Sequence, residues 1–85
     1  MTMVFVTTRS NDSGTSEELI FIHESLEGAK RAATKIAEGV LDSLQITDLG
    51  MDFYEEEDVV FIRIIDTRNG DEHMCYTIRH LIVFI

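Results

Sequence analysis

Apolar residues recur with the period of an α-helix from residue 26 to residue 44, directly after Ser25. Projected at about 100° per residue, they fall on one arc, and charged residues fall on the opposite arc. Ser25 is a good N-cap, and Glu27 lies in the first turn, where the helix dipole favours negative charge. Gly39 weakens the helix, so the helix could end at Gly39 or continue to Leu44. The segment predicts an amphipathic helix. Its buried arc comprises Leu26, Ala29, Ala33, Ile36, Ala37, Val40 and Leu44, and its charged face comprises Glu27, Arg31, Lys35, Glu38 and Asp42.

Segments on both sides of this helix have the composition of β-strands. Residues 1–8 alternate loosely and are rich in Val, Thr and Phe, and residues 17–23 follow as a hairpin partner. Residues 9–16 between them are a cluster of turn formers. Residues 45–54 are ambiguous, because Gly50 indicates a turn and a short strand could lie on either side of it.

A second hairpin is predicted around Asn69-Gly70, a strong hairpin signal between two apolar strands. A two-residue turn would pair Ile64 with Cys75. A three-residue loop closed by Gly70 in the left-handed conformation places apolar residues opposite each other, so we prefer it. It pairs Ile64 with Met74, Ile62 with Tyr76 and Val60 with Ile78, and leaves Arg63, Cys75, Thr77 and Arg79 on the other face with Phe61 and Ile65.

These elements predict a single domain, residues 1–85, of the α+β class. The order is strand, strand, helix, strand, strand, with a short extra strand after the helix as an option. One helix packed on one face of a mostly antiparallel sheet buries the apolar stripes. Residues 81–85 are all apolar, so residues 79–85 either form a central strand of this sheet or pair with a second copy in a homodimer.

The composition narrows the class of protein. Cys75 is the only cysteine, so an intramolecular disulfide is impossible, which fits a reducing cytoplasm. No segment approaches the roughly 20 apolar residues of a membrane span, and the first residues lack the pattern of a signal peptide. The 85 residues carry a net charge of −9, which repels nucleic acid and anionic membranes. We therefore expect a cytoplasmic protein with no membrane partner.

The charge is densest in an acidic run that precedes the apolar segment 59–65. As a functional surface, the run would bind Arg and Lys clusters of another protein, imitating the phosphates that such clusters hold. Alternatively, it keeps the protein soluble or guards the apolar strand against aggregation. The two aromatic residues inside the run are typical of interface anchors. The candidate partner-binding residues are Asp52, Phe53, Tyr54, Glu55, Glu56, Glu57 and Asp58.

Metal binding, catalysis and nucleic-acid binding have weaker support in the sequence. The acidic run lacks the alternating spacing and central glycine of a calcium loop. His73 and Cys75 would point the same way on a strand, but a second pair of zinc ligands is missing, and no oxyanion hole accompanies them as base and nucleophile. Lys30, Arg31 and Lys35 form a basic patch that is interleaved with acids. We expect no enzyme, no metal, no cofactor and no direct nucleic-acid binding, with a small enzyme or metal protein using His73 and Cys75 as an alternative.

The first half of the chain contains the loop Asn11-Asp12-Ser13-Gly14 between two strands, then the alanine-rich segment 25–33, Ser-Leu-Glu-Gly-Ala-Lys-Arg-Ala-Ala. Over residues 1–42 this arrangement resembles small phage-encoded anti-CRISPR proteins, particularly those directed at type I systems. The resemblance implies a non-enzymatic inhibitor in a host bacterial cell. Such a protein docks on a basic surface of a CRISPR effector subunit and blocks access of nucleic acid. The alternative is a structural or dimerising protein with no inhibitory role.

Overall fold

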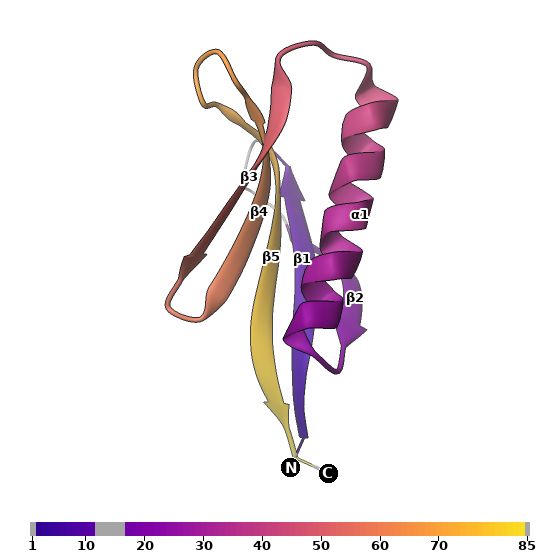
Figure 1. Ribbon diagram of the computed structural model, residues 1–85. Helices are drawn as coiled ribbons and strands as arrows, with labels where there is room; N and C mark the ends of the chain where they lie inside the picture. The colour runs from indigo at the N-terminus through magenta and orange to yellow at the C-terminus, as the bar shows by residue number, and fades with distance from the viewer. Residues whose placement is uncertain (1, 12–16, 85) are drawn as a thin grey trace.

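The computed structural model describes residues 2–11 and 17–84. Its elements are β1 (Thr2–Asn11), β2 (Glu17–His23), α1 (Leu26–Leu44), β3 (Leu49–Glu56), β4 (Val59–Asp66) and β5 (Glu72–Val83). The strands form one five-stranded antiparallel sheet in the order β2-β1-β5-β4-β3, and α1 packs along one face (Figure 1). The predicted α+β class is confirmed, and the optional strand after the helix is present as β3. Among the described residues, no helix has both the length and the apolar character that a membrane span needs.

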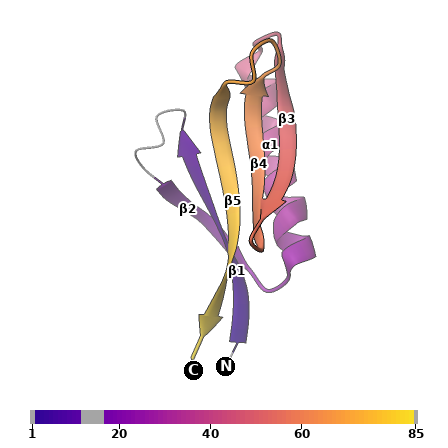
Figure 2. The same ribbon diagram turned by 90° about the vertical axis from the view of Figure 1, so that its left-hand side faces the viewer.

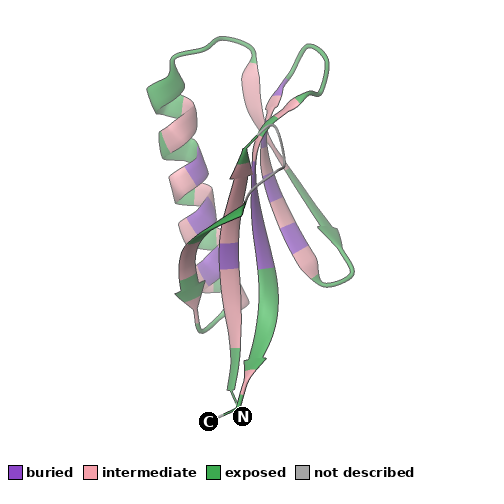
Figure 3. Ribbon diagram, turned by 180° about the vertical axis from the view of Figure 1, so that it is seen from behind, coloured by how far each residue is buried: buried purple, intermediate pink, exposed green. Residues whose placement is uncertain are grey.

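The core lies between α1 and the centre of the sheet (Figure 3). Three fully buried alanines of α1 let the helix backbone approach the strands closely, and large side chains of β4 and β5 fill the space beneath them. The predicted helix arc is therefore confirmed except at Leu44, which is exposed at the last turn. The buried set comprises Ala29, Ala33 and Ala37 with Val60, Ile62, Ile64, Tyr76 and Ile78.

Local signals set the ends of α1. The Ser25 hydroxyl accepts a hydrogen bond from the Gly28 amide at 3.0 Å, which confirms the predicted N-cap. The helix continues through Gly39 to Leu44, and Gln45 ends it in the left-handed conformation at φ 51°. Packing of the apolar arc therefore outweighs the local weakness at Gly39.

The β4–β5 hairpin has the predicted register. Val60 pairs with Ile78, Ile62 with Tyr76, and Ile64 with Met74. The connection is different from the predicted three-residue loop, because the register shifts by one residue between Ile64 and Ile65. Gly70 has the expected positive φ of 78°, and its amide donates to the Asp66 carbonyl at 2.7 Å.

Two sequence expectations are wrong. Residues 9–11 are not part of a turn, because β1 continues to Asn11 and pairs along its whole length with β5. Gly50 does not mark a turn either, because it lies inside β3 opposite Ile65. A Cβ at Gly50 would lie 2.9 Å from the Thr67 methyl carbon, so the glycine permits a close approach of the residue that follows β4. Residues 12–16 of the predicted turn lie outside the described residues.

Candidate interaction surface

The acidic run divides between the two faces of the sheet. Its first five residues belong to β3, an edge strand, in which successive side chains point to opposite faces. Asp52 and Tyr54 lie opposite Arg63 and Phe61 of β4, on the face away from α1. Phe53 and Glu55 lie opposite Ile62 and Val60, on the helix side. The run is therefore not one continuous surface.

On the face away from α1, Asp52 and Tyr54 are held by contacts within the protein. Asp52 forms an ion pair with Arg63, and this hydrogen bond raises the pKa of the guanidinium. Tyr54 stacks on Phe61 with a ring-centroid distance of 4.6 Å and an interplanar angle of 12°. The Arg63 guanidinium carbon lies 5.0 Å from the centroid of the Tyr54 ring. Burial against these neighbours raises the pKa of Tyr54. These two members of the run stabilise the β3–β4 pairing.

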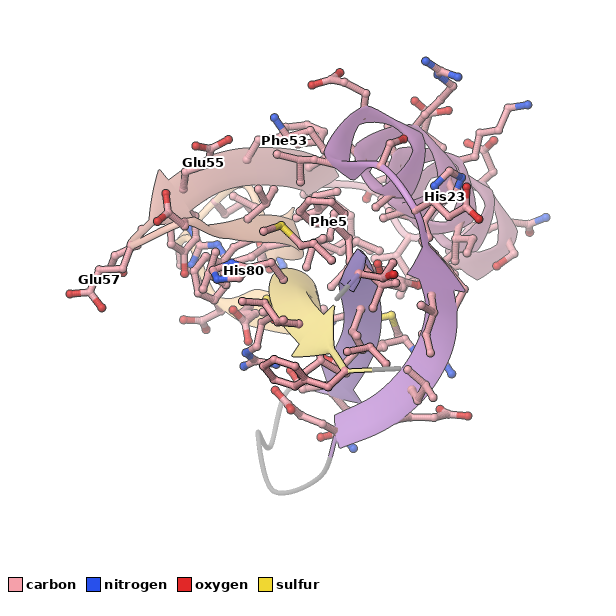
Figure 4. The ribbon with its side chains drawn as sticks, turned by 90° about the horizontal axis from the view of Figure 1, so that it is seen from below. Phe5, His23, Phe53, Glu55, Glu57 and His80 are labelled. Carbon is pink, nitrogen blue, oxygen red and sulfur yellow. The ribbon has the colours of Figure 1, made fainter. Side chains whose placement is uncertain are left out.

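On the helix side, Glu55 forms an ion pair with Lys30 of α1, with 3.2 Å between the carboxylate oxygen and the ammonium nitrogen. Phe53 is exposed beside α1 (Figure 4). It lines a groove of about 310 Å³ between the helix and β3, together with Val60 and Ile62. Glu55 is thus paired within the protein although 60% of its side chain is exposed, and Phe53 remains available as an apolar contact.

Three carboxylates, at the end of β3 and in the β3–β4 turn, differ from Asp52 and Glu55 in having no ion pair among the described residues. They are Glu56, Glu57 and Asp58, all of them exposed, and we call them the acidic tip. Glu57 points away from the body of the protein (Figure 4). Glu57 and Asp58 have φ values of 50° and 65°, a conformation in which side chains with a Cβ are disfavoured. Asn-Gly is the sequence that such a turn prefers, so this turn keeps its carboxylates in spite of local strain.

Most of the protein's basic side chains bind its own carboxylates. Ion pairs join Arg9 to Glu18 at 2.8 Å, Arg68 to Asp66 at 2.7 Å and Arg79 to Glu17 at 3.3 Å, in addition to those of Lys30 and Arg63. Over the ranges that the structure describes, the Lys and Arg side chains without an ion pair are Arg31 and Lys35 of α1. The tip is also the one place in those ranges where three consecutive carboxylates have none.

At the alternative site, His73 and Cys75, burial disfavours the reactive form of the thiol. Cys75 is buried in β5, with its sulfur 3.7 Å from the Thr77 hydroxyl oxygen. Burial raises the pKa of the thiol, so the neutral form predominates at neutral pH, and the thiolate is the form that attacks or binds zinc. Within residues 2–11 and 17–84, no group of three or more His, Cys, Asp or Glu side chains is arranged to hold a metal ion.

No protein-family model, curated protein or solved structure matches this chain.

The two basic partners of the run, Arg63 and Lys30, were not expected from the sequence. Arg63 follows from strand pairing, since placing residues 52–56 antiparallel to β4 sets Asp52 opposite it. Lys30 carries no comparable signal, because its contact with Glu55 crosses from the helix to an edge strand.

Proposed function

We propose that this protein is a non-catalytic inhibitor that presents its acidic tip to a basic surface of another protein. In the cytoplasm of a host bacterium it would act as anti-CRISPR proteins of type I systems do, by occupying a basic surface of the effector complex and blocking nucleic acid. The supporting observation is the tip itself, where two exposed carboxylates stand on left-handed backbone and a third adjoins them. A loop that served only solubility could use an unstrained Asn-Gly turn and place its charges elsewhere.

Electrostatics favours a cationic protein surface as the partner. Carboxylates bind Arg and Lys through charge-assisted hydrogen bonds, and complementary charge speeds the encounter. A groove that normally accepts phosphates offers such side chains, while the net charge of −9 repels nucleic acid itself. The predicted contact set then divides into two roles. The acidic tip and Phe53 would contact the partner, and Asp52, Tyr54 and Glu55 would hold the hairpin that carries them.

The decisive variant neutralises the tip without changing its shape, through Glu56→Gln, Glu57→Gln and Asp58→Asn. Increasing amounts of this variant and of the wild type are added to purified type I effector complexes, and binding of target double-stranded DNA is followed by gel shift. We expect the concentration for half-inhibition to rise at least tenfold in the variant. Wild-type inhibition should also weaken as salt is raised, since exposed charge pairs are screened.

A matched control removes the same charge from another part of the surface, through Glu24→Gln, Glu38→Gln and Asp42→Asn. These three carboxylates are exposed and have no ion pair among the described residues. The control should inhibit like the wild type. Equal losses in both triple variants would show that only net charge matters, and full activity of the tip variant would remove the tip from the interface. If the wild type inhibits no type I effector, affinity capture from bacterial lysates at several salt concentrations tests the broader claim of a basic partner.

A further inference from the structure

Strands β1 and β5 extend beyond the rest of the sheet at the end where the termini lie (Figure 2). Thr2 pairs with Val83, Met3 with Ile82 and Val4 with Leu81. The neighbouring strands stop short, since β4 pairs with β5 only as far as Ile78 and β2 pairs with β1 only as far as Phe5. Residues 80–83 of β5 therefore have β1 on one side and, among the described residues, no strand on the other. We call residues 2–4 and 80–84 the terminal ribbon.

The terminal ribbon displays apolar side chains on both faces. Met3 is 50% exposed, Leu81 52%, Ile82 43% and Phe84 81%. Strand alternation places Met3 and Ile82 on the helix side of the sheet and Leu81 on the other side. A two-stranded ribbon gains little stability by itself, and a free strand edge with apolar side chains readily pairs with another chain. A covering partner would therefore stabilise the ribbon.

The distribution of charge indicates what that partner is. The chain carries a net charge of −9, yet residues 2–10 and 73–84 contain no Asp or Glu. Two copies that pair through these strands bring no carboxylate of the strands together, and screening by salt confines repulsion from the nearby Glu55 and Asp58 to about 10 Å at 0.1 M. The edge strand β3 is different, since its acidic side chains discourage pairing. A second copy offers the ribbon an apolar edge of matching length.

We propose that residues 80–84 of β5 pair antiparallel with the same residues of a second copy, about a two-fold axis at Ile82. The two Ile82 side chains then face each other, and Leu81 faces the second copy's Val83. A two-fold axis at Leu81 would instead place the second copy's Phe84 opposite Ile78, where Val60 is already paired. The length of β4 thus excludes an axis at Leu81, and an axis at Ile82 gives the longest pairing that remains among the described residues. The interface is isologous, because the same edge serves both copies.

This register also provides a site for Phe84. It places the second copy's Phe84 opposite His80, and directly opposed residues of an antiparallel pair point to the same face. His80 lines a groove of about 330 Å³ whose apolar walls include Met3, Phe5 and Leu26, and whose rim also carries the carboxylates of Glu55 and Asp58. Figure 4 shows Phe5 and His80 at this end of the molecule. The most exposed aromatic ring of one copy would therefore be buried in the groove of the other.

Sedimentation equilibrium over a range of concentrations tests the proposal. The wild type should approach twice the mass of one chain, 9.7 kDa. Ile82→Lys should raise the dissociation constant of the dimer at least tenfold, because it sets two charges against each other at the axis. Ile46→Lys is the matched control, since Ile46 is 52% exposed in the loop before β3, and it should leave the dimer intact. Circular dichroism verifies that each variant is folded.

Cysteine crosslinking tests the register. Facing residues have Cβ atoms about 4.5–5.5 Å apart, close to the separation that a disulfide spans. Under mild oxidation, Ile82→Cys should form a covalent dimer, whereas Leu81→Cys, which faces Val83, and the buried Cys75 of the wild type should not. A wild type that stays monomeric at the highest concentration, or no crosslink at position 82, would overturn the proposal. These results are independent of inhibition, so this interface and the acidic tip can fail separately.

Discussion

The turn between β3 and β4 combines backbone strain and negative charge at Asp58, and two substitutions there separate them. Asp58→Gly and Asp58→Ala remove the same carboxylate, but only glycine adopts φ 65° without a steric penalty. The left-handed conformation costs a residue with a Cβ about 1–2 kcal/mol. The greater conformational freedom of glycine in the unfolded chain offsets about 0.5–1 kcal/mol of this gain in stability. Asp58→Gly should therefore be more stable than Asp58→Ala by about 1 kcal/mol, with the wild type between them because Asp tolerates this conformation better than Ala.

Urea unfolding followed by far-UV circular dichroism measures this difference in the free energy of unfolding. In thermal unfolding, a difference of 1 kcal/mol corresponds to about 4–8 °C for a domain of this size. Inhibition should respond in another way. Both variants lose one exposed charge, so both should weaken by the same factor of about two to five. Equal stabilities would refute the strain at Asp58, and unequal inhibition would show that turn conformation, not charge, governs binding.

Two further outcomes follow from the packing of α1 and from the β4–β5 loop. Gly39→Ala should stabilise the protein by about 1 kcal/mol in urea unfolding, because no atom outside the helix lies within 4 Å of the new Cβ. Gly28→Ala should lose that gain, because its Cβ would lie 2.0 Å from Cε1 of His23, and equal effects of the two would contradict this contact. Hydrogen bonds from Arg68 lower the pKa of Asp66 to about 2, so its stabilising effect is complete above about pH 4 and disappears as the pH falls to about 2. Asp66→Asn should therefore lower the free energy of unfolding, relative to the wild type, by less as the pH falls from about 4 to about 2. A difference between variant and wild type that does not vary with pH would contradict this role of Asp66.

The helix and the β4–β5 register were predictable because their signals are local. The apolar arc repeats at the helical period, and apolar residues oppose each other in only one of the two hairpin registers. The strand β3 was not predictable in the same way. Its acidic residues and Gly50 disfavour a strand, and it forms because β4 provides an apolar partner while the edge position leaves the carboxylates in water. Tertiary pairing outweighed local preference.

The candidate site, too, was predictable only in its local features. The sequence located the charge, but a run of consecutive residues does not reveal which side chains share a surface. Once β3 is known, alternation sends Asp52 and Glu55 to opposite faces, and each meets a basic side chain there. The three carboxylates at the end of β3 and in the turn have no such partner among the described residues, so the acidic tip and the exposed Phe53 are the parts of the run that remain available to another protein.

The placement of charge on this sheet also favours recognition over protection as the role of the tip. Acids that guard an apolar strand belong beside an edge that could aggregate. In the folded protein, β4 lies inside the sheet between β5 and β3, and so has no free edge along its paired length. A free apolar edge is present at residues 80–83, which have no acidic neighbour in the sequence, while Glu55 and Asp58 line the groove beside His80. The observed placement fits a molecule that uses the edge for pairing with itself and the tip for contact with a cationic partner.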